Sequence, residues 1–462
     1  MESLIGQSEE ARERKRELTP EWPRGSYMPV RTKLLFMFAF ALSWMAISIY
    51  LAQPWIRNLT VVTGAVFAWL IVAGVALIPG YVNSFMIAGL LLDRRPGFTI
   101  PDKLPGLSVL IAAYNEEPSI GETLDSLQRQ KYRGDLEILV INDGSTDRTA
   151  EIVREYEKRP EFQNGRLRLE LLDFKENRGK SHVLNAGLER ARHYLTATVD
   201  ADSFLHDDAL NHIVSNHLQS PPDTAATAGC VLVRNSRHNL IAKLQEWDYF
   251  LGISVVKRTQ SLLQGTLVAQ GAFSVYKTEI LRALGGWMPT VGEDIVLTWG
   301  MIADGYRIGF AENAIAFTRV PTTYGAFYRQ RRRWARGMIE AFRYHPKVLI
   351  LPRLNTPFFW TNLFFPFIDL AYIGVLLPGI LAALFLRYYL IAGLMTLFVL
   401  PLALIMYSIM YRKQLAVFRN SALRVRRNYL GGILFAITYQ MIMSPASLMG
   451  YFTELLNRRK VW

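Results

Sequence analysis

The sequence predicts an α/β domain with a mainly parallel sheet, inserted between two sets of transmembrane helices. Between residues 104 and 320, short apolar runs rich in branched side chains alternate with amphipathic segments, as in strands joined by helices. Apolar runs long enough to cross a bilayer stand before and after this stretch. A mean hydropathy of +0.13, with 51% hydrophobic residues, also indicates that part of the chain lies in lipid.

The charge and cysteine content narrow the functional classes. The formal net charge is +13, and excess Lys and Arg in a membrane protein usually marks cytoplasmic flanks. No aromatic-basic motif accompanies this charge, so we expect no nucleic-acid partner. Cys230 is the only cysteine, which excludes an internal disulfide and a Cys-based zinc site. We expect it to be a small buried hydrophobe.

The N-terminal part of the chain predicts a cytosolic tail over residues 1–33 and a hairpin of two transmembrane helices over residues 34–92. No signal-peptide core is visible in the tail. Leu34–Leu51 carries no charge, and Val61–Leu92 is long enough to cross back. Basic residues flank the hairpin on both sides, which places residues 93–320 in the cytosol.

The C-terminal part predicts amphipathic interface helices over residues 321–356, about three transmembrane helices over residues 357–453 and a basic tail over residues 454–462. The apolar runs are Phe358–Leu386, Tyr389–Met410 and Leu430–Tyr451. If the last run crosses fully, the basic tail faces outside, against the positive-inside tendency. Either the chain does not follow this tendency here or one apolar run lies along the membrane interface. Five crossings are preferred over four. Asp369, deep in an apolar run, is expected to face a polar cavity or a partner.

Four strands are expected in the first half of the middle stretch. They are LSVLIAAY, LEILVIND, LRLELLDF and LTATVDAD, with helices starting near Ser119, Asp147, Lys180 and Asp208. Ligands of such sheets bind beyond the carboxyl ends of the strands. The polar residues at those ends are Tyr114, Asn115 and Glu116 after the first strand, Asp143 at the second, and Asp200 and Asp202 after the fourth.

The pair Asp200 and Asp202 is the predicted metal site. With one residue between them, one or both carboxylates can approach a divalent cation whose other ligands are waters and diphosphate oxygens. The alternative is a turn that caps the helix near Asp208. The position of the pair, level with the other strand-end loops, favours the metal site.

Asp143 and Lys180 are predicted contacts of a nucleotide. Asp143 ends a strand, where its carboxylate can accept a base N–H, although Asp147 can equally make this a capped strand–turn–helix junction. Lys180 begins a helix behind a glycine, where a cation and free backbone N–H groups can meet a phosphate. The spacing is not that of a P-loop, and an ordinary surface lysine is the alternative.

Glu293 and Asp294 stand in a polar island where a helix begins. Partial burial there favours a general base that takes a proton from a sugar hydroxyl. The alternative is that both acids only favour the helix dipole.

The segment YRQRRRWARG predicts an amphipathic helix beside the membrane. Arg333 offers a guanidinium that can neutralise a departing diphosphate, and Trp334 an indole that can stack on a sugar ring. Binding of anionic lipid head groups is the alternative interpretation, and it suits Arg331 or Arg332.

These motifs follow one another in the order D, DxD, ED, QxxRW. The residues are Asp143, Asp200-x-Asp202, Glu293-Asp294 and Gln330-x-x-Arg333-Trp334. In this respect residues 105–345 resemble the processive, membrane-integrated family 2 glycosyltransferases, which include cellulose, chitin, hyaluronan and poly-N-acetylglucosamine synthases. QRRRWARG followed by Glu340 is most similar to the bacterial poly-β-1,6-N-acetylglucosamine synthases.

The resemblance implies a GT-A-like, Rossmann-like fold for the middle domain and a role for each motif. The implied roles are a nucleoside pocket at Tyr114, Asn115 and Glu116, uracil binding by Asp143, diphosphate contacts by Lys180 and by Asp202 through Mg²⁺ or Mn²⁺ with Asp200 nearby, a general base at Asp294 beside Glu293, pyrophosphate contacts by Gln330 and Arg333, and acceptor stacking by Trp334. Gly292 departs from the threonine that the family often has before Glu-Asp, so a threonine contact to the acceptor is not carried over.

The resemblance further implies a metal-dependent, inverting and processive transferase of the inner membrane. It would polymerise a β-linked exopolysaccharide of biofilms from a UDP-sugar, with UDP-GlcNAc preferred, and pass it across the bilayer. The alternatives are a cellulose-like β-glucan synthase using UDP-glucose, a non-processive lipid glycosyltransferase, and a transporter or lipid-binding scaffold. The implied partners are the donor, the growing polysaccharide, the lipid bilayer and a small membrane accessory subunit, through which any control by a cyclic dinucleotide would act.

Overall fold

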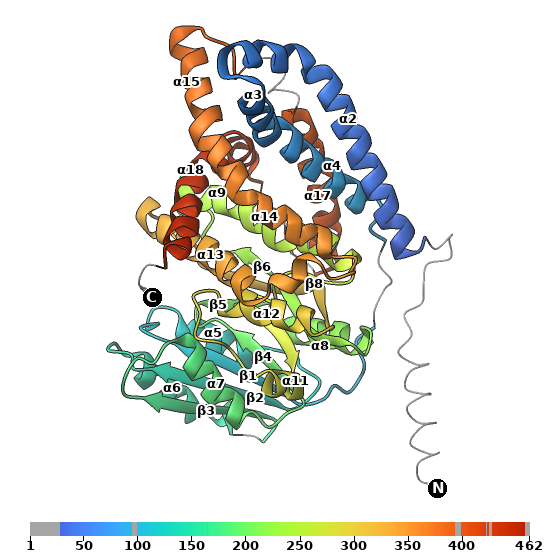
Figure 1. Cartoon of the computed structure of the whole chain (residues 1–462). Coiled ribbons are helices and arrows are strands. Elements are labelled where there is room, and N and C mark those ends of the chain that lie inside the picture. The colour runs from blue at the N-terminus through green and yellow to red at the C-terminus, as the bar shows by residue number, and fades with distance from the viewer. Residues whose placement is uncertain are drawn as a thin grey trace.

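The computed structural model describes residues 28–94, 99–163, 165–392, 399–421, 423–424 and 427–457. An α/β domain lies at one end of the molecule and long apolar helices lie at the other (Figure 1). Two shorter helices, α9 (Leu240–Asp248) and α13 (Tyr324–Tyr344), lie between the sheet and the long helices.

Four helical segments in the described ranges are long and apolar enough to cross a membrane. They are α2 (Val30–Thr63), the run of α3 (Ala65–Val72), η1 (Ala73–Leu77) and α4 (Ile78–Leu91), the run of α14 (Thr356–Ala371), η5 (Tyr372–Leu376) and α15 (Leu377–Leu386), and α18 (Tyr429–Leu455). The first two correspond to the expected hairpin. Helix α17 (Val399–Asn420) is not in this group, and residues 393–398 lie outside the described residues, so the crossing expected at Tyr389–Met410 stays a prediction.

The α/β domain is built on one eight-stranded sheet in the order β3-β2-β1-β4-β7-β6-β8-β5. The strands are β1 (Leu107–Ala113), β2 (Leu136–Asp143), β3 (Leu167–Phe174), β4 (Leu195–Val199), β5 (Ser203–Leu205), β6 (Thr224–Val233), β7 (Phe273–Lys277) and β8 (Arg307–Thr318). The first four are mutually parallel, which confirms the predicted mainly parallel α/β class. Strand β7 runs antiparallel between β4 and β6, and it was not among the predicted strands.

The helices of this domain connect its strands. They are α5 (Ile120–Gln128), α6 (Thr149–Glu157), α7 (Lys180–Arg190), α8 (Ala209–Gln219), α10 (Val256–Leu262), α11 (Thr278–Ala283) and α12 (Glu293–Ala303), with short turns η2 (Pro160–Phe162), η3 (Tyr249–Val255) and η4 (Pro346–Leu349). The first four begin within two residues of the starts predicted from the sequence.

The central strands are continuous apolar runs because both faces of the sheet are covered. On one face Leu139 and Ile141 join the core that also includes the membrane-side helices. On the other face Ile138 and Val140 join a separate core beneath α5 and α8. A sheet buried on both sides needs apolar residues at every position rather than at alternate ones. The carboxyl ends of its parallel strands then meet at one edge.

Buried ion pairs tie the N-terminal hairpin to the α/β domain. Arg258 of α10 contacts both Asp93, which follows α4, and Glu312 of β8. Lys413 Nζ of α17 donates to the backbone oxygen of Asp93 at 2.8 Å. Breaking a buried pair of this kind leaves an uncompensated charge, so the network fixes how the hairpin sits on the domain.

Asp369 has partners, as expected for an ionisable side chain in an apolar helix. Its Oδ1 accepts hydrogen bonds from Gln440 Nε2 at 2.5 Å and Ser444 Oγ at 2.6 Å. Its Oδ2 accepts one from the Tyr451 hydroxyl at 3.1 Å. The carboxylate therefore joins α14 to α18.

Candidate active site

The loop between β4 and β5 brings the Asp200–Asp202 pair next to the start of α7. Lys180 is the first residue of α7, and its Nζ lies 2.7 Å from Asp200 Oδ1. The same Nζ lies 3.3 Å from Glu293 Oε1 at the start of α12. Burial lowers the pKa of Lys180, but these two carboxylates outweigh that effect and hold it above its usual value. Three predicted site residues from separate motifs thus meet here.

Asp202 has no such cation beside it in the described part of the chain. Its Oδ1 accepts a hydrogen bond from Thr318 Oγ1 at 3.3 Å, at the end of β8. Burial, followed by the neighbouring carboxylates Asp200 and Glu116, raises the pKa of Asp202 to about 7. Burial is also the main reason that the pKa of Glu116 is raised. We call Glu116, Lys180, Asp200, Asp202 and Glu293 the strand-end cluster.

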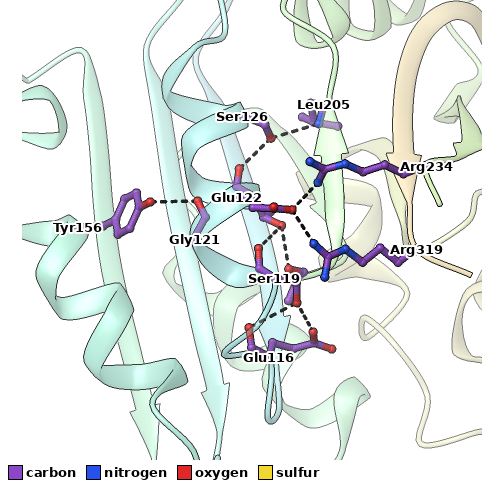
Figure 2. A network of polar contacts seen from close by, with 11 residues as sticks. Glu116, Ser119, Gly121, Glu122, Ser126, Tyr156, Leu205, Arg234 and Arg319 are labelled. Carbon is purple, nitrogen blue, oxygen red and sulfur yellow. Dashed lines mark hydrogen bonds and ion pairs between the residues drawn. The ribbon is translucent and has the colours of Figure 1, made fainter. Parts of the chain in front are cut away.

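Figure 2 shows how the helix after Glu116 is held. Ser119 Oγ donates to Glu116 Oε2 at 2.5 Å, which fixes the turn that leads into α5. Glu122, one turn later, contacts Arg234 after β6 and lies 3.0 Å from Nη2 of Arg319 after β8. These ion pairs join the parallel half of the sheet to the second half, beside the strand-end cluster.

Further hydrogen bonds hold α5 from its two sides (Figure 2). Ser126 Oγ accepts from the backbone nitrogen of Leu205 at 3.1 Å. The Tyr156 hydroxyl donates to the Gly121 carbonyl oxygen at 3.1 Å. The turn carrying Glu116 is therefore anchored to β5 and to α6.

The predicted nucleoside residues lie on two interlocked loops. Tyr114 is half exposed, and Asn115 adopts a left-handed conformation with φ of 54°. Asn115 Oδ1 accepts from the backbone nitrogen of Thr146 at 2.8 Å, and its own backbone nitrogen donates to Ser145 Oγ at 2.9 Å. The loops after β1 and β2 thus form one wall.

Asp143 is buried and already engaged by the backbone. Its two oxygens accept from the backbone nitrogens of Arg178 at 2.7 Å and Gly179 at 3.0 Å, just before α7. Because a carboxylate has about four acceptor sites, this leaves room for a further donor. Asp143 therefore positions Lys180 through the turn that precedes it, and uracil binding by Asp143 stays a prediction.

Asp294 faces the strand-end cluster across one backbone segment. Its Oδ2 accepts from the backbone nitrogen of Gly271 at 3.3 Å. A Cβ at Gly271 would lie 3.1 Å from Lys180 Nζ, so the glycine backbone runs directly between the two side chains. Beside Asp294, burial raises the pKa of Glu293 against the opposing effect of Lys180. The two adjacent acids thus have different partners, because Glu293 contacts Lys180 and Asp294 contacts the Gly271 backbone.

Helix α13 carries the three predicted residues Gln330, Arg333 and Trp334. Arg333 is exposed, and its charge has a small lowering effect on the pKa of both Lys180 and Glu293. Within the described residues, the buried Oε1 of Gln330 accepts no hydrogen bond. Trp334 is 40% exposed and its ring centroid lies 6.0 Å from that of Tyr249.

Arg331 corrects a sequence interpretation, because it does not face lipid head groups. It is buried, and its Nη2 lies 2.8 Å from Asp248 Oδ2. Its guanidinium carbon lies 4.0 Å from the centroid of the Trp334 ring, a cation–π contact. We call Arg331, Asp248, Tyr249 and Trp334 the Arg331 clamp. Arg332, the other arginine given that interpretation, is half buried.

Two glycines let α12 approach α13. A Cβ at Gly292 would lie 2.6 Å from the Cα of Gly337, and one at Gly337 would lie 2.7 Å from the Cα of Gly292. The backbone nitrogen of Gly292 donates to the buried Glu340 Oε2 at 3.1 Å. Gly292, the departure noted in the sequence, is therefore required by this packing.

Sequence reasoning missed Lys257. It lies on α10 and is buried, with its Nζ donating to the Val268 carbonyl oxygen at 2.8 Å. Burial lowers the pKa of Lys257 to about 7, against the opposing effect of Asp294. A lysine inside an otherwise ordinary helix gives no signal in the sequence, because only the tertiary structure buries it.

The fit of the cluster to a divalent cation rests on Asp202. Among the described residues, no group of three or more His, Cys, Asp or Glu side chains is arranged as a metal site. In the part of the chain that the structure describes, the cluster instead offers two carboxylates that form no ion pair, Asp202 and Glu116, beside Asp200. Such a set fits Mg²⁺ or Mn²⁺ when a diphosphate and water supply the remaining oxygen ligands.

Comparisons with known proteins agree with this fold. Residues 108–285 match the family described as Glycosyl transferase family 2. The poly-beta-1,6-N-acetyl-D-glucosamine synthase of Staphylococcus aureus (strain COL) is 32% identical over 247 residues, which cover 53% of this chain and 57% of that protein. That of Staphylococcus epidermidis is 34% identical over 236 residues, covering 51% and 55%. The chain thus spans little more than half the length of these curated relatives.

Among solved structures, a mannosyltransferase of Pyrobaculum calidifontis in complex with GDP-Man and Mn²⁺ matches with a TM-score of 0.57. The match covers 84% of this chain and 98% of that chain at 21% identity, so it concerns the fold. Sheet order, family match and fold therefore agree: residues 108–285 match Glycosyl transferase family 2, and the α/β domain has a GT-A-like fold with apolar helices on both sides of it in the sequence.

Proposed function

We propose that this protein is a membrane polysaccharide synthase that polymerises a β-linked chain from a UDP-sugar with inversion at the anomeric carbon. One observation carries the proposal. The strand-end cluster, Asp294 and helix α13 meet at one edge of the sheet, with Lys180 contacting both Asp200 and Glu293. Neighbouring side chains can therefore bind the donor diphosphate, act as the base and bind the acceptor.

In the proposed reaction, Asp294 takes the proton from the attacking hydroxyl of the acceptor. The hydroxyl oxygen bonds to the anomeric carbon as the bond from that carbon to the diphosphate oxygen breaks, and UDP leaves with the bonding electron pair. The hydrogen bond from Gly271 holds one oxygen of Asp294 at 3.3 Å and orients the carboxylate. A single displacement of this kind inverts the configuration.

Lys180 and Arg333 are proposed to stabilise the departing diphosphate. Lys180 keeps its charge because its pKa is raised by Asp200 and Glu293, and Arg333 is exposed, with its charge acting on Lys180 and Glu293. Gln330, with its buried and unpartnered Oε1, would accept a hydrogen bond from the substrate. A divalent cation held by Asp202 and Asp200 would neutralise the diphosphate charge.

Processive elongation is proposed from the position of Trp334. The Arg331 clamp holds this indole beside the membrane-facing helices, where it can stack on the acceptor sugar. A product that leaves along these helices is passed toward the bilayer, with the α/β domain in the cytosol. A small accessory membrane subunit remains part of the proposal.

UDP-GlcNAc is the proposed donor because the relatives at 32% and 34% identity are named poly-beta-1,6-N-acetyl-D-glucosamine synthases. The test is a UDP-release assay on the purified protein in nanodiscs with UDP-GlcNAc, UDP-glucose and UDP-glucuronate, each with Mg²⁺ or Mn²⁺. We expect release with UDP-GlcNAc and a labelled product many sugars long. Release with UDP-glucose instead indicates a β-glucan synthase, single-sugar products indicate a lipid transferase, and the absence of release with all donors refutes the proposal.

A further inference from the structure

Helix α18 contacts α9 where it begins. Asn428, just before α18, donates through Nδ2 to the Lys243 carbonyl oxygen at 3.0 Å and to Glu246 Oε2 at 2.6 Å. In return, Trp247 Nε1 donates to the Asn428 carbonyl oxygen at 2.9 Å. All three partners belong to α9, so the first turn of α18 is fixed to that helix.

The opposite end of α18 contacts α13, the other helix between the sheet and the long helices. Glu454 is buried, and its Oε2 lies 2.7 Å from Arg336 Nε. Its Oε1 lies 3.3 Å from Arg343 Nη1. One turn earlier, a Cβ at Gly450 would lie 2.5 Å from the backbone oxygen of Arg332, so the two helices touch through their backbones.

The middle of α18 follows the same surface. The Phe327 and Tyr439 rings meet edge to face with centroids 5.9 Å apart. Helices α9 and α13 are themselves joined by the ion pair between Asp248 and Arg331 at 2.8 Å. Beginning, middle and end of α18 therefore lie on one continuous surface, which α9 and α13 form together.

The length of α18, taken together with the position of its two ends, distinguishes a helix that crosses the membrane from one that lies on it. The helix has 27 residues, which is about 40 Å at a rise of about 1.5 Å per residue. A helix that crosses a hydrocarbon core of about 30 Å has its two ends on opposite sides. Both ends of α18 are fixed to α9 and α13, the two helices between the sheet and the long helices, so α18 runs along this layer.

We propose that α18 is an interfacial helix, which lies along the membrane surface with both ends on the side of the α/β domain. The face of α18 that points away from α9 and α13 contacts the lipid surface. Large apolar side chains are exposed from the first turn of the helix to the last, as a helix in the interface requires. They are Leu430, Ile433, Ile437, Met449 and Phe452. The conflict with the positive-inside tendency, which a full crossing would create, then disappears.

Cysteine labelling in whole cells tests this inference without reference to activity. The native Cys230 is buried, so the unmodified chain serves as the unlabelled background. The test position is Asn457→Cys after α18, and the two references are Lys158→Cys on the α/β domain and Tyr388→Cys after α15. All three positions are exposed. Each variant is treated with a membrane-impermeant maleimide before and after permeabilisation.

We expect Asn457→Cys to label under the same condition as Lys158→Cys, and Tyr388→Cys to label under the opposite one. Labelling of all three after permeabilisation shows that each variant is present and accessible. If Asn457→Cys instead behaves like Tyr388→Cys, α18 crosses the membrane and the inference is wrong. The comparison does not depend on which sugar the protein uses, so it stands apart from the proposed function.

Depth measurements provide a second readout. Spin labels at Leu430, Ile437 and Phe452 are placed in nanodiscs and their collisions with oxygen and a water-soluble nickel chelate are compared. An interfacial helix keeps all three at a similar shallow depth of about 5–10 Å. A label at Ile437 that lies near the bilayer centre, with the other two near the surfaces, contradicts the inference.

Discussion

The strand-end cluster and the Arg331 clamp both hold charges that are at least partly buried, but the cluster is only partly compensated: Lys180 pairs with Asp200 and Glu293, whereas Asp202 forms no ion pair among the described residues. Burial lowers the pKa of Arg331, yet Asp248 outweighs this effect and the pKa stays above its usual value. In the cluster, burial and neighbouring carboxylates raise the pKa of Asp202 to about 7. The charges of the clamp are therefore compensated without a ligand, whereas the carboxylates of the cluster are stabilised when a cation binds.

This difference assigns the two regions different parts in the proposed reaction. A compensated and packed clamp keeps Trp334 in one place through many cycles. An under-compensated cluster can bind and release a charged donor in each cycle. Substitutions in the cluster should therefore reduce activity and spare the fold, and substitutions in the clamp should reduce stability first.

The largest effect is expected for Asp294→Asn. Loss of the proposed base should lower UDP release by about 1000-fold, the middle of the range for general base catalysis, while the melting temperature stays close to wild type. Asp304→Asn, an exposed acid after the same helix, is the matched control and should keep full activity. Wild-type release by Asp294→Asn would remove Asp294 from the mechanism.

Arg331→Gln should destabilise the fold by about 3 kcal/mol, because it leaves Asp248 without its cation in a buried place. Thermal unfolding in detergent measures the loss. Arg332→Gln removes the same charge from the adjacent residue and should have only a small effect on stability. The double variant Arg331→Met with Asp248→Asn should recover part of the lost stability. A double variant no more stable than Arg331→Gln would show that the ion pair is not the reason.

Asp202→Asn should lower UDP release by about 100-fold, the scale for losing one group that stabilises transition-state charge. It should also weaken Mn²⁺ binding in the presence of UDP, which calorimetry measures. Asp207→Asn, in the loop just beyond β5, is the control. Unchanged Mn²⁺ affinity in Asp202→Asn would place the metal elsewhere.

The smallest effect is expected for Lys257→Met, and it depends on pH. The pKa of Lys257 is lowered to about 7 in the fold, so at or below pH 7 the buried amine carries a charge that costs stability. This cost fades as the pH rises from 7 toward the unfolded value of 10.5. Lys257→Met should therefore stabilise the protein by about 1 kcal/mol near pH 7.

Thermal unfolding at pH 7 and pH 9.5 measures the Lys257→Met effect. The stabilisation should shrink at the higher pH, because the wild-type lysine is then mostly neutral. Lys243→Met, on α9, provides a lysine control outside the buried site. An equal shift at both pH values would show that packing, and not charge, is responsible.

The parallel half of the fold could be predicted because each strand is a short branched run with a helix start behind it. Strands β1 to β4 were found in this way. Strand β6 has the sequence TAATAGCVLV, which is poor in large branched residues, and its place in the sheet depends on β7, far along the chain. Long-range pairing of this kind has no local signal.

The site could be predicted where its residues sit at strand ends, as Asp200 and Asp202 do. The role of Arg331 could not, because a run of arginines beside a membrane indicates lipid contact when read alone. Its carboxylate partner Asp248 lies on another helix, and only the fold brings the two within 2.8 Å. Lys257 was missed for the same reason, since burial is a property of the fold.

The contact between Gly292 and Gly337 has a consequence for how this protein can evolve. Backbone touches backbone there, so no side chain exists whose size could tune the distance between the two helices. Any larger residue at either position must move a whole helix, and with it either Asp294 or the QxxRW segment. We therefore expect substitutions at Gly292 and Gly337 to occur together among relatives.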